Sequence, residues 1–136
     1  MATILLMEDD LTVGFELTRD LIMAGHSARM CTSASEAKEE LLREEYDLLI
    51  SDVIVKVDGR AVPDGGIGLV GWVRRTDRVR TLPIIVITGT FRYPGMENIL
   101  DLARQIGADV GIEKPFKAKE LLAKVEVLTR SDKRAS

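Results

Sequence analysis

Apolar and polar positions follow two different periods along this chain. Short, nearly continuous apolar runs recur, and each is followed by a longer stretch whose apolar residues fall three or four positions apart. The runs predict strands at 3–7, 27–31, 47–51, 83–88 and 108–112. The first, third and fourth are almost wholly apolar, which is typical of strands covered on both faces of a sheet. The second and fifth are weaker, so we place them at the edges.

The longer stretches predict five helices. Each has an apolar stripe at helical spacing, which we interpret as the face packed against the core. The stripes are Leu11, Phe15, Thr18, Leu21 and Ile22; Ala34, Ala37, Leu41 and Leu42; Leu69, Val70 and Val73; Met96, Ile99, Leu100, Ala103 and Ile106; and Leu121, Leu122, Val125 and Leu128. Because strand and helix alternate strictly, the sequence predicts a parallel sheet with helices on both faces, joined by right-handed crossovers.

Length and composition fit one ordinary globular domain. The chain has 136 residues, of which 46% are hydrophobic and 30% are charged. We expect the domain to span 1–130, with 131–136 as a flexible C-terminal tail. A net charge of −3 provides no broad basic surface, so direct binding of nucleic acid is not expected.

No segment predicts export or membrane insertion. The N-terminus is too short and too acidic for a signal peptide, and no apolar run approaches the roughly 18 residues that cross a membrane. A cytoplasmic location without membrane attachment is therefore expected. The single cysteine, Cys31, excludes an internal disulfide and a cysteine-rich zinc site.

Polar residues gather where the predicted strands end. In an open parallel sheet, ligands bind beyond the carboxyl ends of the strands, where the strand order reverses. If the first, third, fourth and fifth strands are neighbours, the polar residues that follow them meet in one pocket. These residues are Glu8, Asp9, Asp10, Asp52, Thr88 and Lys114.

Such a pocket suits a metal ion and a phosphoryl group. Two carboxylates about 4 Å apart repel by roughly 4 kcal/mol at an effective dielectric constant of about 20. A divalent cation removes that cost, and hard oxygen ligands favour Mg²⁺. Asp52 can then stay ionised and act as a nucleophile, while Thr88 donates a hydrogen bond to a phosphoryl oxygen and Lys114 supplies positive charge. This set favours phosphoryl transfer, in which catalysis is mostly positioning and charge neutralisation.

Each of these residues also has a plainer interpretation. Acids after a strand can cap the next helix and favour its N-terminal dipole. A lone aspartate at a strand end is often a turn residue, and "EKPF" can be an ordinary loop. Their occurrence in order at four separate strand ends favours the pocket.

Four stretches, "ILLMEDD", "DLLISDVIV", "PIIVITG" and "GADVGIEKPF", together resemble the receiver domain of two-component response regulators. The resemblance covers essentially the whole chain. It implies a flavodoxin-like, doubly wound α/β fold of five parallel strands in the order 2-1-3-4-5, with five helices. It also implies phosphorylation by a histidine kinase or phosphotransfer protein, and no enzymatic activity beyond the domain's own phosphorylation and dephosphorylation.

The same resemblance assigns roles to individual residues. Asp52 would be the phosphoacceptor and a metal ligand. Glu8 and Asp9 would complete the acidic magnesium site, with Asp9 the more direct ligand, and the backbone carbonyl of Ile54 would be the last protein ligand. The partners implied are a histidine kinase or phosphotransfer protein and an unidentified downstream protein, and a homodimer is left open.

The phosphoryl contacts would come from Thr88 and Lys114, and the Lys114–Pro115 peptide bond would be cis. Here the chain also departs from the family pattern. Receiver domains usually carry an aromatic residue three positions before the lysine, which rotates with the threonine on activation. In this chain that position is Gly111.

Two connections are long for the family. The segment 53–68 after Asp52, "VIVKVDGRAVPDGGIG", predicts a turn followed by a helix start. It can be a tolerated insertion, a partner-specific surface or a lid. The segment after Thr88 carries Phe91 and Tyr93, one of which can replace the missing aromatic residue, or both can simply anchor the loop.

The leading interpretation is a receiver whose phosphorylation changes its protein–protein contacts, because a phosphoryl group adds roughly −1.5 to −2 charges. It can stand alone or be part of a longer protein. The alternative is a constitutive receiver-like interaction module in which phosphorylation is lost or minor. Gly111 leaves it open, whereas the intact set argues against it, namely Glu8, Asp9, Asp52, Thr88 and Lys114. A flavodoxin-like flavin carrier would need a hydroxyl-rich phosphate loop after the first strand, where this chain has three acids.

Overall fold

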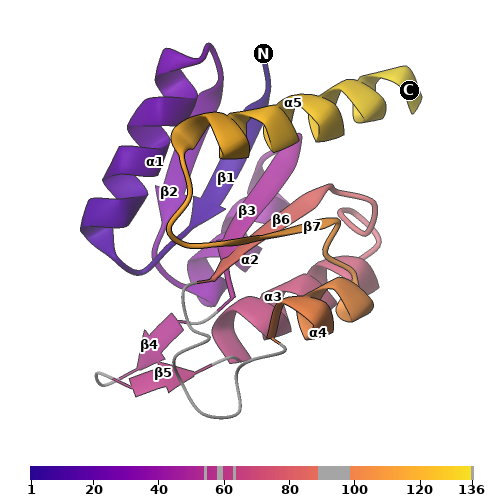
Figure 1. The fold of residues 1–136 in the computed structure, drawn as a ribbon. Helices are drawn as coiled ribbons and strands as arrows, with labels where there is room; N and C mark the ends of the chain where they lie inside the picture. The colour runs from indigo at the N-terminus through magenta and orange to yellow at the C-terminus, as the bar shows by residue number, and fades with distance from the viewer. Residues whose placement is uncertain (54, 58–59, 63, 89–98, 136) are drawn as a thin grey trace.

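Strands and helices alternate along the chain except between residues 48 and 62, where three strands follow one another (Figure 1). The computed structural model describes the backbone of residues 1–53, 55–57, 60–62, 64–88 and 99–135, and the side chains of residues 1–53, 66–88 and 99–130. The elements are β1 (Thr3–Met7), α1 (Leu11–Met23), β2 (Ser27–Cys31), α2 (Ala34–Arg43), β3 (Leu48–Asp52), β4 (Val55–Val57), β5 (Arg60–Val62), α3 (Asp64–Arg75), β6 (Ile84–Thr88), α4 (Ile99–Ile106), β7 (Val110–Glu113) and α5 (Ala118–Ala135).

Five strands form one parallel sheet in the order β2-β1-β3-β6-β7. Counted along the chain within this sheet, that is the predicted order 2-1-3-4-5, so the expected doubly wound α/β fold is confirmed. The chain first places β2 on one side of β1 and then crosses to place β3 on the other. The strand order therefore reverses between β1 and β3, and the carboxyl ends of these two strands are where a ligand site is expected.

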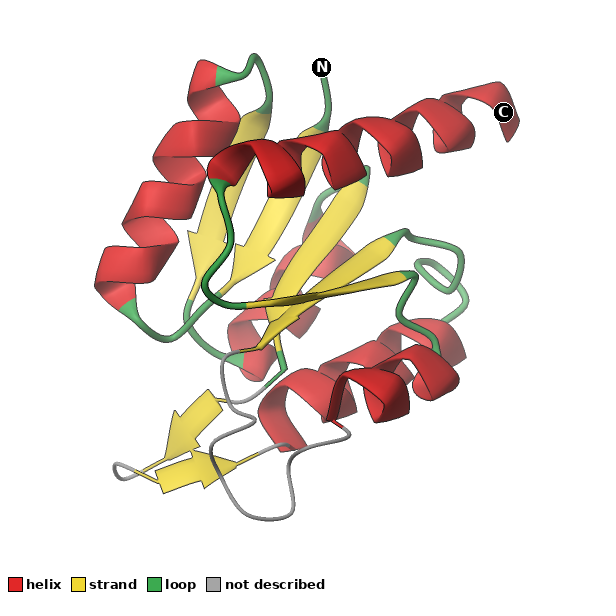
Figure 2. Ribbon diagram, in the orientation of Figure 1, coloured by secondary structure: helices red, strands yellow, loops and turns green. Residues whose placement is uncertain are grey.

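Helices cover both faces of the sheet (Figure 2). On one face, α1 and α5 pack over alternate side chains of β1, β3 and β6, and on the other face α2, α3 and α4 pack over the intervening ones. Strands β3 and β6 are buried along their whole length. This double burial is the reason that both were visible in the sequence as nearly continuous apolar runs.

Aspartates mark where two of the strands begin. The side chain of Asp47, just before β3, accepts a hydrogen bond from the backbone N–H of Thr3 at 2.8 Å. Asp109, just before β7, does the same for the N–H of Ile84 at 2.8 Å. The backbone N–H of each aspartate donates to the carbonyl of the same residue, so each aspartate holds the neighbouring strand by two hydrogen bonds. The last three predicted strands begin one or two residues later than the apolar pattern suggests.

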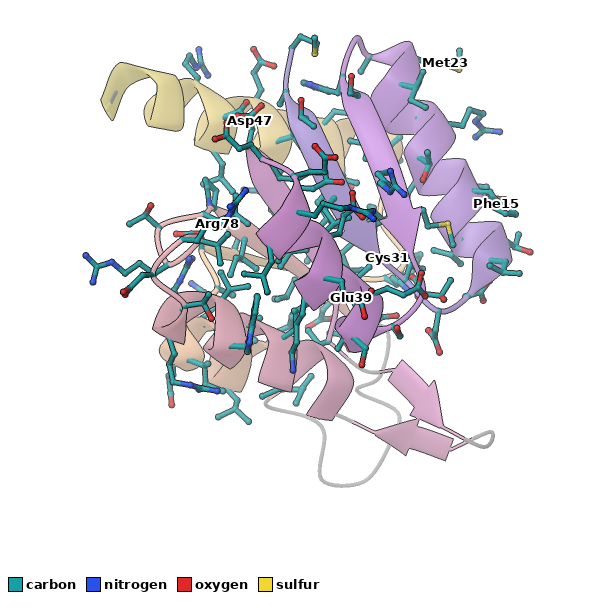
Figure 3. All side chains as sticks on the ribbon, turned by 180° about the vertical axis from the view of Figure 1, so that it is seen from behind. Phe15, Met23, Cys31, Glu39, Asp47 and Arg78 are labelled. Carbon is teal, nitrogen blue, oxygen red and sulfur yellow. The ribbon has the colours of Figure 1, made fainter. Side chains whose placement is uncertain are left out.

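The apolar stripe predicted for α1 lies only partly in the core, which corrects the sequence analysis. Of its residues, Leu21 is buried, whereas Leu11, Phe15 and Ile22 are each more than half exposed. Figure 3 shows Phe15 and Met23 pointing away from the sheet. The outer side of α1 therefore carries several exposed apolar side chains among its polar ones.

The buried face of α1 is formed by Gly14, Leu17 and Leu21. Gly14 lies against Met30 of β2, where an added Cβ would come within 2.4 Å of the Met30 Cε atom. The Met30 side chain fills the space that a side chain at position 14 would take, and Leu17 and Leu21 complete the buried face. On α2, the predicted core residue Leu42 is likewise exposed.

A small antiparallel hairpin, β4-β5, stands apart from the main sheet and is absent from the sequence prediction. It follows β3 at the edge where the parallel strands end (Figure 1). Its signal was present in "VKVDGRAV", because an Asp-Gly pair between alternating apolar residues is typical of a two-residue hairpin turn. Part of the long 53–68 segment therefore has regular backbone structure.

Helix α5 continues to Ala135, so the backbone of most of the predicted tail is helical. The domain boundary at 130 and the flexibility of 131–136 stay predictions. Within the part of the chain that the structure describes, no helix combines the length and apolar character needed to cross a bilayer.

Candidate functional site

Three carboxylates meet at the reversal of strand order. Glu8 and Asp9 directly follow β1, and Asp52 is the last residue of β3. The strand register pairs Met7 with Ser51, so the residues after them lie side by side. Each of the three acids offers a carboxylate oxygen, and these atoms lie within 4.8 Å of one another. The structure thus brings together three of the four acids that the sequence placed in one pocket.

Burial makes this cluster unusual. Glu8 is 1% exposed and Asp52 is 6% exposed, while Asp9 is half-buried. A buried carboxylate needs a charged or hydrogen-bonded partner to remain ionised. Ser51, which is fully buried beside Asp52, donates its hydroxyl hydrogen to the Asp52 backbone carbonyl at 3.1 Å and so fixes the main chain there.

Lys114 supplies the positive charge. Its Nζ atom lies 2.9 Å from Glu8 Oε1 and 3.5 Å from Asp52 Oδ2. Its backbone N–H donates a hydrogen bond to the carbonyl of Thr88 at 2.7 Å. The peptide bond to Pro115 is cis, as the resemblance implied. The lysine predicted from "EKPF" therefore faces the acidic cluster from the opposite side of β6.

The charges of the cluster perturb each other. The pKa of Glu8 is raised from 4.5 to about 8, mainly by burial and then by the hydrogen bond and negative charge of Asp52, which outweigh Lys114. For Lys114, burial lowers the pKa, but Asp52 and Glu8 raise it more, so its net shift is upward. The lysine therefore stays charged, but its single positive charge does not balance the acidic groups around it.

The donor set fits a small hard cation. Magnesium prefers carboxylate oxygens in near-octahedral geometry and keeps several of its waters. Glu8, Asp9 and Asp52 offer oxygens from two adjacent strand ends, close enough to share one ion. The fourth predicted ligand, the carbonyl of Ile54, lies outside the described residues.

Thr88 lies at the same edge of the sheet. It is the last residue of β6 and is 2% exposed. Because β3 pairs Asp52 with Ile87, Thr88 stands one residue beyond the direct neighbour of Asp52. The three residues predicted to handle a phosphoryl group, Asp52, Thr88 and Lys114, thus come from three neighbouring chain segments at one edge.

Asp10 belongs to the helix and not to the cluster. Its side chain accepts a hydrogen bond from the backbone N–H of Val13 at 3.2 Å and forms the N-cap of α1. The capping interpretation of the "EDD" stretch is therefore correct for its third acid, and Glu8 and Asp9 form the ligand cluster.

Gly66 is a site residue that the sequence analysis did not single out. An added Cβ there would lie 2.1 Å from the backbone oxygen of Asp52 and 2.4 Å from that of Val53. The first turn of α3 therefore packs directly on the main chain after the candidate phosphoacceptor. The paired glycines of "PDGG" were the available signal, because close backbone approach requires a residue without a side chain.

Three further residues were linked to the missing aromatic side chain, namely Phe91, Tyr93 and Gly111. Phe91 and Tyr93 lie outside the described residues, so their proposed role as a substitute aromatic stays a prediction. Gly111 lies in β7, opposite Val86 of β6, and the side chain closest to it comes from Leu100 of α4.

Comparison with known proteins agrees with this site. Residues 4–126 match the response regulator receiver domain family. The transcriptional regulatory protein GltR of Pseudomonas aeruginosa is 32% identical over 129 residues, which cover 94% of this chain and 49% of that protein. The chain spans about half of the length, or less, of the curated relatives it matches.

Solved structures show the same architecture. The signal receiver domain of a signal transduction histidine kinase from Syntrophus aciditrophicus has a TM-score of 0.82 at 28% identity, covering 98% of this chain and 94% of that one. The chemotaxis response regulator CheY4 of Vibrio cholerae shares the fold, with a TM-score of 0.78 at 23% identity over 94% of this chain and 98% of that one. The chain therefore belongs to the response regulator receiver domain family, whose members are signalling phosphoacceptors that bind Mg²⁺ in an acidic pocket.

Proposed function

We propose that Asp52 is the phosphoacceptor of this receiver domain and that a phosphohistidine on a histidine kinase or phosphotransfer protein is its donor. The placement of Asp52 is the observation that carries the proposal. Its carboxylate is nearly buried at the reversal of strand order, with two further acids within 4.8 Å and the Lys114 ammonium group 3.5 Å away. Placing so many charges together is unfavourable for folding alone, which supports a functional reason for the cluster.

In the proposed reaction, a carboxylate oxygen of Asp52 attacks the phosphorus atom of the donor. A P–O bond forms as the P–N bond of the phosphohistidine breaks, and the imidazole leaves with the bonding electrons and takes up a proton. Mg²⁺ bound by Asp9, Asp52 and Glu8 would neutralise charge on the phosphoryl oxygens. The residues of the chain contribute mainly position and charge, which is what this class of reaction requires.

Lys114 and Thr88 would bind the transferred group. Lys114 already lies between Glu8 and Asp52, so its ammonium group can pair with a phosphoryl oxygen carried by Asp52. The hydroxyl of Thr88 would donate to a second oxygen. The 2.7 Å hydrogen bond between the Lys114 N–H and the Thr88 carbonyl supports this assignment, because it holds the two residues at a constant separation.

We propose that the output is a changed protein–protein contact, with no direct contact to nucleic acid. The phosphoryl group adds roughly −1.5 to −2 charges to an edge that already carries three acids. That charge is accommodated by rearrangement of the surrounding segments, and a partner reads the rearranged surface. A constitutive module that binds its partner without phosphorylation is the second candidate, and Gly111 is the observation that favours it.

Intact mass after incubation with acetyl phosphate and Mg²⁺ tests the proposal. The native protein should gain one phosphoryl group, and the gain should require Mg²⁺ and disappear in Asp52→Asn. Asp10→Asn is the matched control, because Asp10 caps α1 and lies outside the acidic cluster. It should be phosphorylated like the native protein.

A phosphorylated histidine phosphotransfer protein serves as the second donor. Transfer from this protein but not from acetyl phosphate would retain the proposed role of Asp52 and show that small donors are excluded. No gain of mass from either donor, with Mg²⁺ still bound, would refute the phosphoacceptor role and favour the constitutive module.

A further inference from the structure

A hollow of about 420 Å³ opens at the amino-terminal edge of the sheet, between the α2–β3 and α3–β6 connections. Leu41, Val79 and Leu82 form apolar parts of its lining, and acidic and basic residues border it. The strands run from this edge towards the acidic cluster (Figure 2). Because β3 separates Asp47 from Asp52, a rise of roughly 3.3 Å per residue puts this edge about 16 Å from the candidate phosphoacceptor.

The two connections carry opposite charge. Residues 44–47, the acidic loop, read "EEYD" and contain three acids and no base. Residues 75–81, the basic segment, read "RTDRVRT" and contain three arginines and one aspartate. Asp47 of the acidic loop and Arg78 of the basic segment border the same hollow (Figure 3). Two strips of opposite charge therefore lie on either side of one apolar hollow.

The charges of the two strips are available to a partner. Four of the charged residues are exposed, namely Glu44, Glu45, Arg78 and Arg80. Among the side chains that the structure describes, no ion pair joins the acidic loop to the basic segment. The two strips are thus close enough to border one hollow but do not neutralise each other within one copy of the chain.

Hydrogen bonds hold both connections in place. The backbone N–H of Asp47 donates to the Thr3 carbonyl at 2.7 Å, and the Asp47 side chain accepts from the Thr3 N–H. The guanidinium group of Arg74 donates to the carbonyls of Arg80 at 2.9 Å and Leu82 at 2.7 Å. A surface that is ordered before binding loses less conformational freedom when a partner binds. The acidic loop and the basic segment are therefore preorganised for a contact.

A surface with strips of opposite charge on either side of a hollow is complementary to its own copy. In a two-fold symmetric pair the same patch is used on both copies, so an axis that runs between the strips puts each acidic loop opposite a basic segment. A partner with one sign of charge would be attracted by one strip and repelled by the other. We propose that this edge pairs two copies of the chain, with the acidic loop of each opposite the basic segment of the other. The pairing needs neither Mg²⁺ nor a phosphoryl group, because Asp52 lies at the other end of β3.

Sedimentation velocity over a range of protein concentrations tests the pairing, and the native protein should form a dimer. Reversing the charge of one strip leaves the whole edge with one sign of charge. Glu44→Lys with Glu45→Lys, and separately Arg78→Glu with Arg80→Glu, should therefore weaken self-association by about tenfold or more. Because these two double variants have edges of opposite sign, an equal mixture of them should form a heterodimer.

A control variant separates local complementarity from net charge. Glu120→Lys with Glu126→Lys makes the same change of net charge at exposed positions of α5. Alone it should pair like the native protein, and mixed with Arg78→Glu/Arg80→Glu it should not restore pairing. Thermal unfolding of each variant verifies that it is folded, as expected for substitutions of exposed side chains.

A native protein that stays monomeric at every concentration would overturn the pairing. Reversals that leave the native dimer unchanged, or that fail to combine in the mixture, would overturn it as well. Acetyl phosphate and Mg²⁺ should leave the dimer unchanged, with intact mass reporting the phosphoryl group on the same samples. A dimer that forms only after phosphorylation would place the contact on another surface. None of these outcomes bears on the role of Asp52, which the gain of mass alone decides.

Discussion

Lys114 Nζ lies 2.9 Å from Glu8 Oε1, nearer than to Asp52 Oδ2 at 3.5 Å. The lysine therefore binds the acid that follows β1 and also faces Asp52. Without bound Mg²⁺, Lys114→Met should lower the free energy of unfolding by about 1–3 kcal/mol, because it removes the hydrogen-bond partner of a buried carboxyl group and the positive charge beside Asp52. Mg²⁺ should recover much of that loss, since the cation replaces the missing positive charge. Urea unfolding with EDTA and with Mg²⁺ measures both effects, and an equal loss under the two conditions would contradict this account.

Glu8 should couple magnesium binding to protons. Its pKa is about 8 in the folded protein against 4.5 for the free side chain. The folded state therefore holds more protons than the unfolded state between these two values, and the stability of the metal-free protein should fall as pH rises through that window. Magnesium needs the ionised carboxylate, so its binding should release a proton and tighten up to about pH 8.

Calorimetric titration with Mg²⁺ in buffers of different ionisation enthalpy measures that release. Glu8→Gln removes the titrating group, and its magnesium binding should lose the proton release while retaining Asp9 and Asp52 as ligands. A native protein whose binding enthalpy is independent of the buffer at pH 6.5 to 7.5, a range that falls below the folded pKa of about 8, would count against the shifted pKa.

Replacing each of two glycines of α3 by alanine should have opposite effects on the stability of the protein. At Gly66 a Cβ would meet the Asp52 backbone oxygen at 2.1 Å, so Gly66→Ala should cost about 1–3 kcal/mol and impair phosphorylation by displacing the main chain of Asp52. At Gly68 nothing lies within 4 Å, and Gly68→Ala should stabilise the helix by about 0.5–1 kcal/mol. Thermal unfolding and acetyl phosphate labelling of the pair check this, and similar behaviour of the two variants would disprove the close approach.

Replacing Arg74 by lysine should lower the stability of the protein. Its guanidinium group donates to the carbonyls of Gly107 at 2.9 Å and Leu82 at 2.7 Å and to the Asp109 carboxylate at 3.0 Å. Lysine cannot reproduce this planar set of donors, so Arg74→Lys should destabilise the protein by about 1.5–3 kcal/mol. The neighbouring Arg75→Lys, at an exposed position, should change the unfolding midpoint little. Equal midpoints for the two variants would show that the Arg74 contacts contribute nothing.

The two apolar stripes of α1 should differ in their effect on stability. Leu17 is 7% exposed and Phe15 is 62% exposed. Leu17→Ala should cost about 2–5 kcal/mol because it leaves a cavity, whereas Phe15→Ala should stay within about 0.5 kcal/mol of the native protein. Denaturant unfolding compares them directly. A large loss from Phe15→Ala would mean that the sequence-based stripe, and not the Gly14 face, packs on the sheet.

The local pattern of apolar runs fixes the position of each site residue that the sequence located correctly. Asp52, Thr88 and Lys114 each end or follow an apolar run, and in a parallel sheet all such positions share one edge. The strand periodicity therefore predicted the parallel α/β fold and the set of residues at the site edge, and the family resemblance supplied the strand order 2-1-3-4-5. Their magnesium and phosphoryl roles stay proposals until the mass measurement is made.

Tertiary packing decided what local pattern left ambiguous. Helix α1 has two stripes apolar enough to be buried, and the folded chain buries the one that contains Gly14 and Leu17, with Met30 of β2 packed against Gly14. The pairing of Lys114 with Glu8, and the contacts of Gly66 and Gly111 with distant segments, join residues far apart in sequence. Hydrophobic periodicity does not reveal a glycine at a close contact between segments, because what matters there is the absence of a side chain. The sequence by itself thus determined which residues reach the site edge, and only the folded chain determined how closely they pack there and which of them pair.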